Sequence, residues 1–439
     1  MSKRHGNKAG DFESLFLRLE ELVLANSGED EFEEVFNLLV AKLWDEQTGK
    51  PAAFRPHWDS KETYEAIRAL LRGAENQWPG VLAGATEPAL TPEHLQVCVD
   101  ALSRHRIWDA GLEVMDSFFE FMVARGAKGS KGQYFTPRHV VEMCIRMLRP
   151  AKDETLVDPA CGSAGFLIHG LNYVRNRYHL DEADVRQYCA TRLWGFDIDA
   201  RAVRVAKALM ILAGDGQANI IRLNSLLRPH MGGLFPVARD GEGDEGALVL
   251  TIEDICRTRF RHHKGFDVIA TNPPFAGEVR EGHILESYDS SRGKPRIERD
   301  VLFLERCVEL LRPGGRLAIV LPHNKFATSA WTHVREMLFK KARVTAVVGL
   351  GRNTFLPHTH QKASVLFATK RLPGEAVRPD ERIFFAISEK DGKNSKGQLL
   401  MLPDVSEDDS SWTRVDHDLG QIEREFFEFC EADNMVLGS

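Results

Sequence analysis

Residues 266–275 have the sequence Phe266-Asp267-Val268-Ile269-Ala270-Thr271-Asn272-Pro273-Pro274-Phe275, an apolar run that ends in Asn-Pro-Pro-Phe. A short apolar run of this kind is typical of a buried strand. Two consecutive prolines fix φ and lack N–H donors, so neither a helix nor a central strand continues through them. The sequence therefore predicts a strand whose carboxyl end holds Asn272, Pro273 and Phe275 in a rigid loop.

A glycine-containing turn follows an earlier strand, with the sequence Asp158-Pro159-Ala160-Cys161-Gly162-Ser163-Ala164-Gly165-Phe166. Gly162 and Gly165 allow the turn to approach a ligand closely, because no Cβ stands in the way. The turn lacks the G-x-G-x-x-G pattern that cradles a dinucleotide pyrophosphate, so a zwitterionic nucleoside without phosphates fits it better. Asp197 ends the next strand and is placed to bind ribose hydroxyls, with Asp199 as the fallback. Helix N-capping is the alternative role of Asp158 and Asp197.

Together the two motifs predict methyl transfer to a planar amine. The nitrogen lone pair of such an amine is delocalised into its ring, and it becomes nucleophilic only when acceptors hold its hydrogens. The side-chain oxygen of Asn272 and the carbonyl of Pro273 can be those acceptors. The ring of Phe275 offers a flat face on which a base can stack.

From about Gly132 to about Lys370 the chain resembles the N6-adenine DNA methyltransferases, and most closely the modification subunits of type I restriction-modification systems. The first element of the resemblance is Gly132-Gln133-Tyr134-Phe135-Thr136-Pro137-Arg138, which is similar to the family's segment that reaches the methionine part of S-adenosylmethionine. The glycine turn and the Asn-Pro-Pro-Phe motif follow in the family's gamma order. Thr354-Phe355-Leu356-Pro357 and Lys362-Ala363-Ser364-Val365-Leu366-Phe367 resemble the family's late strand and hairpin.

This resemblance implies direct methyl transfer from S-adenosylmethionine to the exocyclic N6 of a flipped-out adenine in double-stranded DNA, without a covalent enzyme intermediate. The implied catalytic residues are Asn272, Pro273, Pro274 and Phe275. The implied cofactor-binding residues are Tyr134, Phe135, Thr136, Asp158, Ala160, Gly162, Ser163, Gly165, Phe166, Asp197, Asn224 and Asn272. The family usually has Asp where Asn224 stands, and an amide oxygen accepts a hydrogen bond equally well.

The resemblance also implies partners. These are a separate DNA-specificity subunit, commonly bound by two modification subunits, and in some systems a restriction subunit. The chain has no obvious module that presents Arg, Asn or Gln to base edges, as reading a DNA sequence requires. Two alternatives stay open: a protein-glutamine or RNA amino methyltransferase, which meets the same lone-pair problem, and a cofactor-binding scaffold without activity.

Composition sets outer limits. With 439 residues, 43% apolar and 28% charged, the chain is long enough for about two or three domains. The polar start and the short apolar runs predict a cytoplasmic protein without membrane contact. Seven scattered cysteines without C-x-x-C spacing predict buried or idle thiols and no metal site.

The net charge of -7 is unusual for a DNA enzyme. One stretch is basic, and it predicts either a local DNA contact or a solvated loop; its cations are Arg280, Arg292, Lys294, Arg296 and Arg299.

The predicted organisation is a helical domain over residues 1–127, a doubly wound α/β S-adenosylmethionine-dependent methyltransferase domain over 128–375, and an acidic extension over 376–439. The apolar residues of the extension either dock a partner or form a terminal helix packed on its own domain. Thr91 is a predicted N-cap, and residues 276–299 are predicted to form a loop. The predicted strands are Thr155–Asp158, Leu193–Asp197, Ile220–Leu223, Asp267–Thr271, Leu317–Pro322, Val344–Leu350 and Ala363–Thr369.

Overall fold

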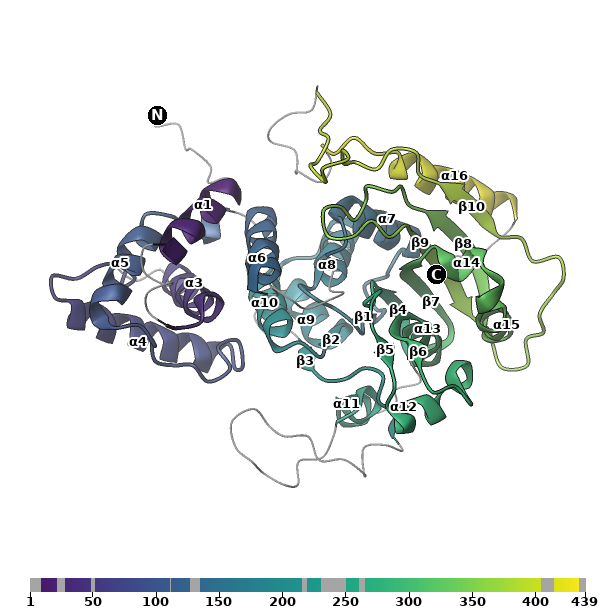
Figure 1. Cartoon of the computed structure of the whole chain (residues 1–439), viewed down its shortest axis with the longest axis horizontal. Helices are drawn as coiled ribbons and strands as arrows, with labels where there is room; N and C mark the ends of the chain where they lie inside the picture. Colours follow the sequence, from purple (N-terminus) through teal and green to yellow (C-terminus); the bar gives the residue numbers. More distant parts are fainter. Residues whose placement is uncertain are drawn as a thin grey trace. The chain divides into compact units, whose positions relative to one another are not determined.

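The computed structural model of the chain divides into two compact units, which are described separately (Figure 1). The first unit contains residues Met1–Ser130 and Ala200–Ala218, and the second contains Lys131–Asp199 and Asn219–Ser439. The predicted domain boundaries after residues 127 and 375 stay predictions. The residues that the structure describes are 9–21, 28–48, 52–110, 112–126, 135–214, 219–229, 250–259, 265–403 and 414–433.

The first unit is helical, as the apolar spacing of its sequence predicts. Its elements are α1 (Ala9–Leu19), α3 (Glu31–Thr48), α4 (Ser60–Gln77), α5 (Pro92–Ser103), η2 (Trp108–Ala110), α6 (Leu112–Gly126) and α10 (Ala200–Leu212). Aromatic rings form much of the core: Phe118 contacts Phe12, and Phe119 contacts Phe36. The predicted N-cap is confirmed, because the Thr91 hydroxyl accepts a hydrogen bond from the backbone N–H of His94.

Helix α10 groups with the first unit through a buried arginine. The Arg204 guanidinium donates to the Val81 carbonyl at 2.8 Å and to the Asn37 side chain at 2.7 Å, and it forms an ion pair with Glu33. A buried guanidinium is tolerated only where such partners replace water. Because periodicity does not reveal a partner far away in the sequence, this grouping was not predicted.

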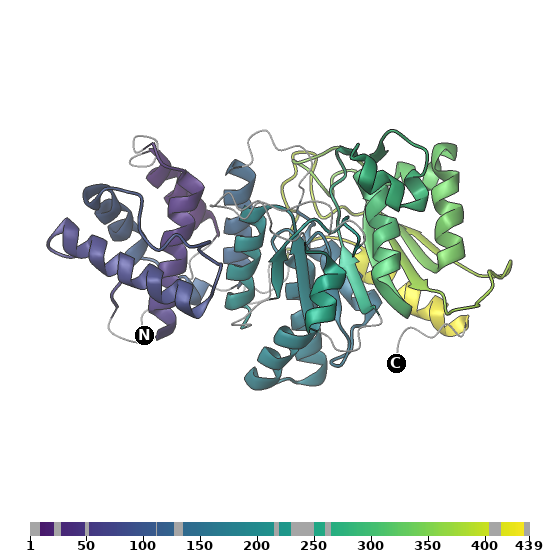
Figure 2. The same cartoon turned by 90° about the horizontal axis from the view of Figure 1, so that it is seen from below.

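The second unit is built on an eight-stranded sheet with the order β10-β8-β9-β7-β4-β1-β2-β3 (Figures 1 and 2). Neighbouring strands are parallel except at β9, which runs antiparallel to both β7 and β8. All the predicted strands are present, most with small differences at their ends, but β7 begins at Leu311 and not at the predicted Leu317. The strands are β1 (Leu156–Asp158), β2 (Leu193–Asp197), β3 (Ile220–Arg222), β4 (Phe266–Thr271), β7 (Leu311–Pro322), β8 (Ala342–Gly349), β9 (Ala363–Lys370) and β10 (Phe384–Ile387).

Helices cover both faces of this sheet. Leu156 points to α8, where it lies so close to Gly170 that any Cβ there would collide with it. Its neighbour Val157 points to the opposite face and joins the apolar cluster formed with α11, α13 and α15. The helices are α7 (Arg138–Leu148), α8 (Gly165–Tyr178), α9 (Glu182–Arg192), α11 (Ile252–Arg259), α13 (Arg299–Leu310), α14 (Asn324–Ala327), α15 (Thr332–Lys341) and α16 (Leu419–Ala432), with the short η5 (Ser329–Trp331).

The segment 276–299, which we call the arm, is ordered, so the predicted loop is wrong. Its ends pair as β5 (Glu278–Val279) and β6 (Ile297–Glu298), and between them lie α12 (Gly282–Ser287) and η4 (Asp289–Ser291). Charged and glycine residues made the segment look like a solvated loop. A few apolar side chains nevertheless anchor it in the cluster of α13 and α15.

The C-terminal helix α16 packs on its own unit. Phe426 is 1% exposed and contacts Phe367 of β9 and Phe384 of β10. The Arg149 guanidinium lies 3.7 Å from the centre of the Phe427 ring. This packing supports the terminal-helix alternative for these phenylalanines. The acidic residues Glu407-Asp408-Asp409 lie outside the described residues.

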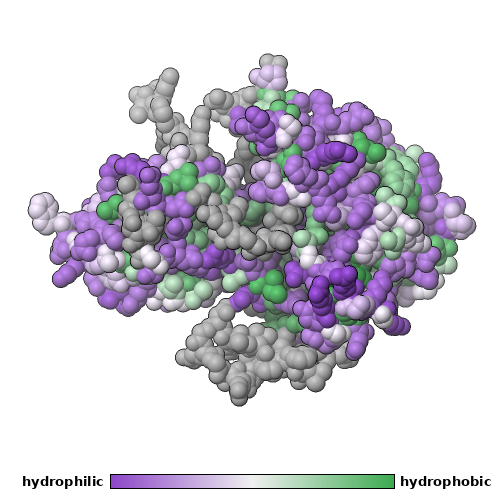
Figure 3. All heavy atoms as spheres, viewed as in Figure 1, coloured by the Kyte–Doolittle hydropathy of each residue, from purple (hydrophilic) through white to green (hydrophobic). Residues whose placement is uncertain are grey.

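The described part of the chain has no helix that is both long and apolar enough to cross a bilayer. The seven cysteines are buried, in agreement with the sequence-based interpretation. Among the described residues no group of three or more His, Cys, Asp or Glu side chains could hold a metal ion. Hydrophilic residues predominate on the face of the molecule shown in Figure 3, with apolar ones scattered among them.

Candidate active site at the carboxyl ends of the strands

Both sequence motifs lie at one edge of the sheet, where the carboxyl ends of parallel strands β1, β2, β3 and β4 meet. Ligands of doubly wound sheets bind at this edge. A hydrogen bond joins the two motifs: the Thr271 hydroxyl, at the end of β4, donates to Asp158 Oδ1, at the end of β1, over 2.6 Å. Asn272 follows Thr271 directly, so this bond fixes where the second motif begins.

The buried Asp158 side chain joins neighbouring segments by hydrogen bonds and does not cap a helix. It is 1% exposed, and its Oδ1 also accepts from the Ala160 backbone N–H at 3.0 Å. Burial raises the pKa of the Asp158 carboxyl to about 7, the two hydrogen bonds oppose the rise, and the charge of Asp197 adds to it. Helix α8 begins after Ala164 instead.

The glycine turn is fastened to the end of β2. The Cys161 backbone N–H donates to the Phe196 carbonyl at 3.0 Å, and the Gly162 N–H donates to Asp197 Oδ2 at 2.9 Å. The other oxygen of Asp197 accepts from the Asp199 N–H at 2.9 Å. Burial raises the pKa of the Asp197 carboxyl, although its side chain is still partly exposed at the strand end. Two backbone donors therefore hold one carboxylate beside the turn.

The end of β3 is tied to the same turn. The Ser225 hydroxyl donates to the Pro159 carbonyl at 2.6 Å, and the Ser225 carbonyl accepts from the buried guanidinium of Arg306 at 2.8 Å. Next to it, the side-chain oxygen of Asn224 accepts from the Leu226 N–H at 3.1 Å. Asn224 is partly exposed at this edge. Neither Ser225 nor Arg306 was expected from the sequence.

Arg138 is a further residue that the sequence did not single out. It starts α7, is 9% exposed, and its guanidinium lies 3.3 Å from the Ser163 hydroxyl. A Cβ at Gly165 would stand 1.7 Å from a guanidinium nitrogen, so only glycine leaves room for this arginine. The Thr136-Pro137-Arg138 sequence was the available signal. Thr136 is buried, Phe135 is partly exposed, and Tyr134 lies outside the described residues.

The second motif continues the line of β4. Asn272 and Pro274 are partly exposed, and Pro273 is buried. Phe275 is 6% exposed, and its ring meets the Phe355 ring edge-on, with centroids 5.5 Å apart. The late segment 354–357 therefore lies beside this motif. The base-stacking role of Phe275 stays a prediction.

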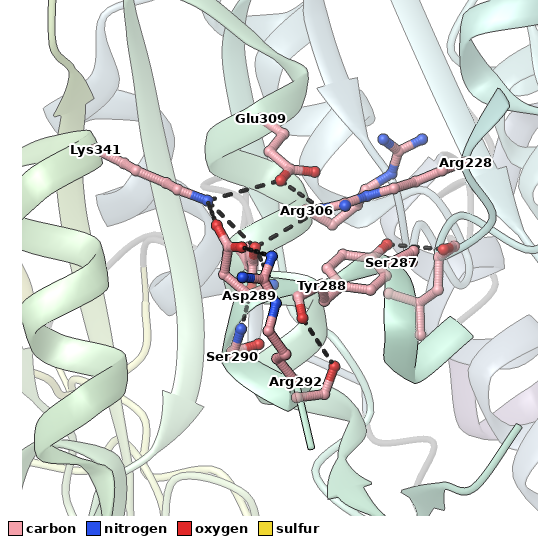
Figure 4. A network of polar contacts seen from close by, with 12 residues as sticks. Arg228, Ser287, Tyr288, Asp289, Ser290, Arg292, Arg306, Glu309 and Lys341 are labelled. Atoms are coloured by element: carbon pink, nitrogen blue, oxygen red, sulfur yellow. Dashed lines mark hydrogen bonds and ion pairs between the residues drawn. The ribbon is translucent and has the colours of Figure 1, made fainter. Parts of the chain in front are cut away.

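A buried polar network holds the arm that follows the motif (Figure 4). Glu305 of α13, which is 0% exposed, accepts from the backbone N–H groups of Asp289 and Ser290 and from Lys341. The Tyr288 hydroxyl donates to the Leu226 carbonyl at 2.7 Å, and the Arg228 guanidinium lies 3.9 Å from the centre of the Tyr288 ring. The arm is thus fixed to α13, to α15 and to the segment after β3.

The remaining predicted residues of the turn differ in their exposure, and their cofactor-binding roles stay predictions. Phe166 is buried. The Cys161 sulfur lies 3.1 Å from where a Cβ on Gly195 would be, which agrees with the packing interpretation of this thiol. Ala160 and Gly162 are partly exposed, and a Cβ on Gly162 would have no heavy atom within 4 Å. The turn therefore faces open space at Gly162.

These residues fit S-adenosylmethionine better than a phosphate-bearing nucleotide. The carboxylate of Asp197 holds the turn at Gly162, and its charge repels phosphate and favours a sulfonium. The open space at Gly162 lies beside the carboxylate of Asp197, which has lone pairs left for hydroxyl donors.

A comparison with protein families agrees with this geometry, because the family model for N-6 DNA Methylase matches residues 112–416. The chain belongs to the N-6 DNA methylase family. The matched region extends from α6 to the start of the α16 segment and includes every candidate site residue. The sequence-based resemblance to this family is confirmed.

Individual relatives of this chain point the same way. The StySPI methylase subunit of a type I restriction enzyme from Salmonella potsdam is 29% identical over 373 residues, which are 79% of this chain and 64% of that protein. Two further type I methylase subunits, both from Escherichia coli, are covered over 44% and 43% of their lengths. The chain thus spans less than two thirds of the length of these curated relatives.

Solved structures share the fold of this family member. The type I restriction-modification methyltransferase subunit from Streptococcus thermophilus superposes with a TM-score of 0.57 at 15% identity, over 96% of this chain and 94% of its own. A candidate class I S-adenosylmethionine-dependent methyltransferase from Listeria monocytogenes gives a TM-score of 0.54 at 16% identity, over 86% and 92%. The predicted methyltransferase sheet is confirmed.

The buried Asp158 predicts an unusual pH dependence of stability. Its folded-state pKa of about 7 lies above the ordinary value of 3.8, so its ionised form destabilises the fold above about pH 7, and the effect disappears as pH falls toward 4. Asp158→Asn keeps an acceptor for Thr271 and removes the charge. We expect it to melt about 2–4 °C above the wild type near pH 8, with the difference vanishing below about pH 4.

Asp267→Asn, on the neighbouring strand β4, is the matched control. Although burial opposes its charge, hydrogen bonds from Thr155 and the ion pair with Arg312 lower the pKa of Asp267. This variant should therefore melt below the wild type near pH 8, with the deficit shrinking in acid. A lower melting temperature for Asp158→Asn at every pH would contradict the burial argument.

Proposed function

We propose that this chain transfers a methyl group from S-adenosylmethionine to the exocyclic N6 of a flipped-out adenine in DNA, as the modification subunit of a restriction-modification or related defence system in the cytoplasm. The observation that carries the proposal is the Thr271–Asp158 hydrogen bond, which sets the Asn-Pro-Pro-Phe motif beside the glycine turn. The family membership and the methylase subunits among the relatives support the same substrate.

On the cofactor side, the chain supplies hydrogen-bond acceptors at fixed positions. Asp197, held by two backbone N–H groups, would accept from the ribose hydroxyls, and Asn224 from the adenine amine. The buried Arg138 contacts Ser163 of the turn, and Tyr134, Phe135 and Thr136 would bind the methionine part, as the family resemblance implies. When bound, S-adenosylmethionine supplies the electrophilic methyl group on its sulfonium.

On the substrate side, the chain orients the amine. The Asn272 side chain and the Pro273 carbonyl would accept its two hydrogens, which leaves the lone pair available for attack. Positioning of this kind lowers the barrier by several kcal/mol, because the entropy of alignment is lost before the reaction. Flipping the adenine costs roughly a few kcal/mol, and stacking on Phe275 would return about 1–3 kcal/mol.

We further propose that the regions outside the catalytic sheet serve DNA and partners. The helical residues 1–127 would help to close over DNA, and the acidic residues 376–439 would contact a partner. A separate specificity subunit, bound by two copies of this chain, would choose the site, and a restriction subunit would join in some assemblies. The relatives named as methylase subunits of type I restriction enzymes support action within such an assembly.

Different mutations should impair cofactor binding and methyl transfer. Asp197→Ala removes a charged acceptor, so we expect the Kd for S-adenosylmethionine to rise about tenfold. Asn272→Ala should leave that Kd nearly unchanged and lower kcat at least about 100-fold. Calorimetry and a methylation assay measure the two quantities, and Asp199→Ala tests the fallback acid. An equal loss of cofactor affinity in both variants would remove Asn272 from catalysis.

The ring of Phe275 should matter most when the target adenine is paired. Because a mismatched base flips more easily, Phe275→Ala should lower kcat/KM about tenfold on a matched duplex and less on a duplex with the adenine mismatched. Phe355→Leu controls for the edge-on packing of the two rings. An equal loss on both substrates, or the same selective loss in Phe355→Leu, would assign Phe275 to packing instead.

The chain should need a partner to choose its DNA site. Radiolabelled S-adenosylmethionine is incubated with unmethylated genomic DNA, RNA or cell protein, with and without the co-expressed specificity subunit. We expect cofactor binding by the chain alone, little methylation, and adenine methylation of DNA once the subunit is added. Label in RNA or in protein glutamine would establish the alternative function. Efficient methylation of one motif by the isolated chain would indicate a solitary enzyme.

A further inference from the structure

The arm that follows the Asn-Pro-Pro-Phe motif contains five cations, Arg280, Arg292, Lys294, Arg296 and Arg299, but most of them are already engaged. Arg280 and Arg296 share the carboxylate of Glu278, at 3.0 and 3.3 Å. Arg292 forms an ion pair with Asp289 at 3.1 Å. These arginines are therefore neutralised within the arm itself, and the local charge available to an anion is smaller than the sequence suggests.

Lys294 has a different partner, because its Nζ lies 2.6 Å from Nε2 of His333. Burial lowers the pKa of both groups, and the charge of Lys294 lowers the pKa of His333 further. The histidine is therefore neutral near pH 7 and accepts from the lysine. Lys294 is thereby tied to α15 instead of to the segment that carries the motif.

Arg299 is the exception in the arm. Its side chain is exposed, and with the residues that the structure describes it forms no ion pair or side-chain hydrogen bond. The guanidinium lies against Gly277, where a Cβ would stand 3.2 Å from its central carbon. Gly277 follows Phe275 by two residues, so this cation lies next to the proposed substrate side of the site. Backbone hydrogen bonds are the main cause of the lowered pKa of Glu281, and the charge of Arg299 lowers this pKa to a lesser degree.

The backbone that carries Arg299 is rigid. Its N–H donates to the Gly277 carbonyl at 3.2 Å. The residues on either side are held as well: Glu298 forms an ion pair with the buried Lys325, and Asp300, 0% exposed, lies 3.4 Å from the same ammonium. The guanidinium is therefore presented from a fixed base, which reduces the entropy lost when an anion binds it.

We propose that Arg299 binds a DNA phosphate next to the flipped adenine. The proposal rests on the proposed function and names the substrate contact of that same site. An exposed guanidinium with a free fork of donors matches the oxygens of a phosphate, and phosphate contacts set the register of a protein on DNA. Because residue 277 is glycine, the Arg299 guanidinium can lie against the backbone beside the motif. The φ of Gly277, +99°, also disfavours any other residue at this position.

The test compares Arg299→Gln with Arg292→Gln in the full chain purified with its specificity subunit. Both changes remove one positive charge from the arm, but Arg292 is already paired with Asp289. The probes are a fluorescent mixed-sequence duplex for binding and unmethylated genomic DNA for kinetics. For Arg299→Gln we expect about tenfold weaker DNA binding and a slope of log K against log salt reduced by about one. The Kd for S-adenosylmethionine should not change, and Arg299→Lys should restore part of the salt slope.

Arg292→Gln should bind DNA within about twofold of the wild type and keep its salt slope. An unchanged slope in Arg299→Gln, or an equal reduction in both variants, would overturn the proposal. If the wild-type complex binds DNA but methylates nothing, the proposed function fails, and the binding slopes still decide the role of Arg299.

Discussion

The hydrogen bond between Thr271 and Asp158 is the constraint on which the candidate site depends. It lies inside the sheet edge where β1 and β4 end, and it decides how the chain enters the Asn-Pro-Pro-Phe motif. Such a bond is strong only because both partners are almost completely buried. The same burial disfavours the aspartate charge, so the bond partly offsets a cost that the fold itself creates. An aspartate in this position is thus better explained by the geometry of the site than by stability.

Around this bond the strand ends are joined by contacts of one type, in which a side chain meets the backbone of a neighbouring turn. Ser225 reaches Pro159, Asp197 holds the turn at Gly162, and Arg306 holds the segment after β3. Each contact satisfies a backbone group that the loops would otherwise leave unpaired. The result is a site whose shape is set before any ligand arrives, which reduces the ordering that binding requires.

The strands were predictable because each is a buried apolar run, and the two motifs were predictable because proline and glycine restrict the backbone. The unpredicted features share another origin, since each depends on partners far apart in the sequence. Arg204 ties α10 to residues more than a hundred positions earlier, and Glu305 orders an arm that looks polar along the chain. Strand β10 was missed because Phe385 and Ile387, at 70% and 67% exposure, obscure its periodicity. Arg138 was overlooked because its importance depends on the missing Cβ of Gly165.

Under the proposed function, the charge of the chain limits how it can bind DNA. Many of its buried arginines and lysines serve the fold: Arg306 is bound by Glu253, Arg316 by Glu154, and Lys325 by Glu298 and Asp300. These pairs are neutral as units, so they add little to the attraction of a polyanion, and the net charge of -7 opposes it at long range. Under the proposed function, affinity for DNA comes from a few cations placed at the site, or from the basic surface of a partner. Such an enzyme would gain little from nonspecific binding, and its residence on DNA would depend on the assembly that brings it there.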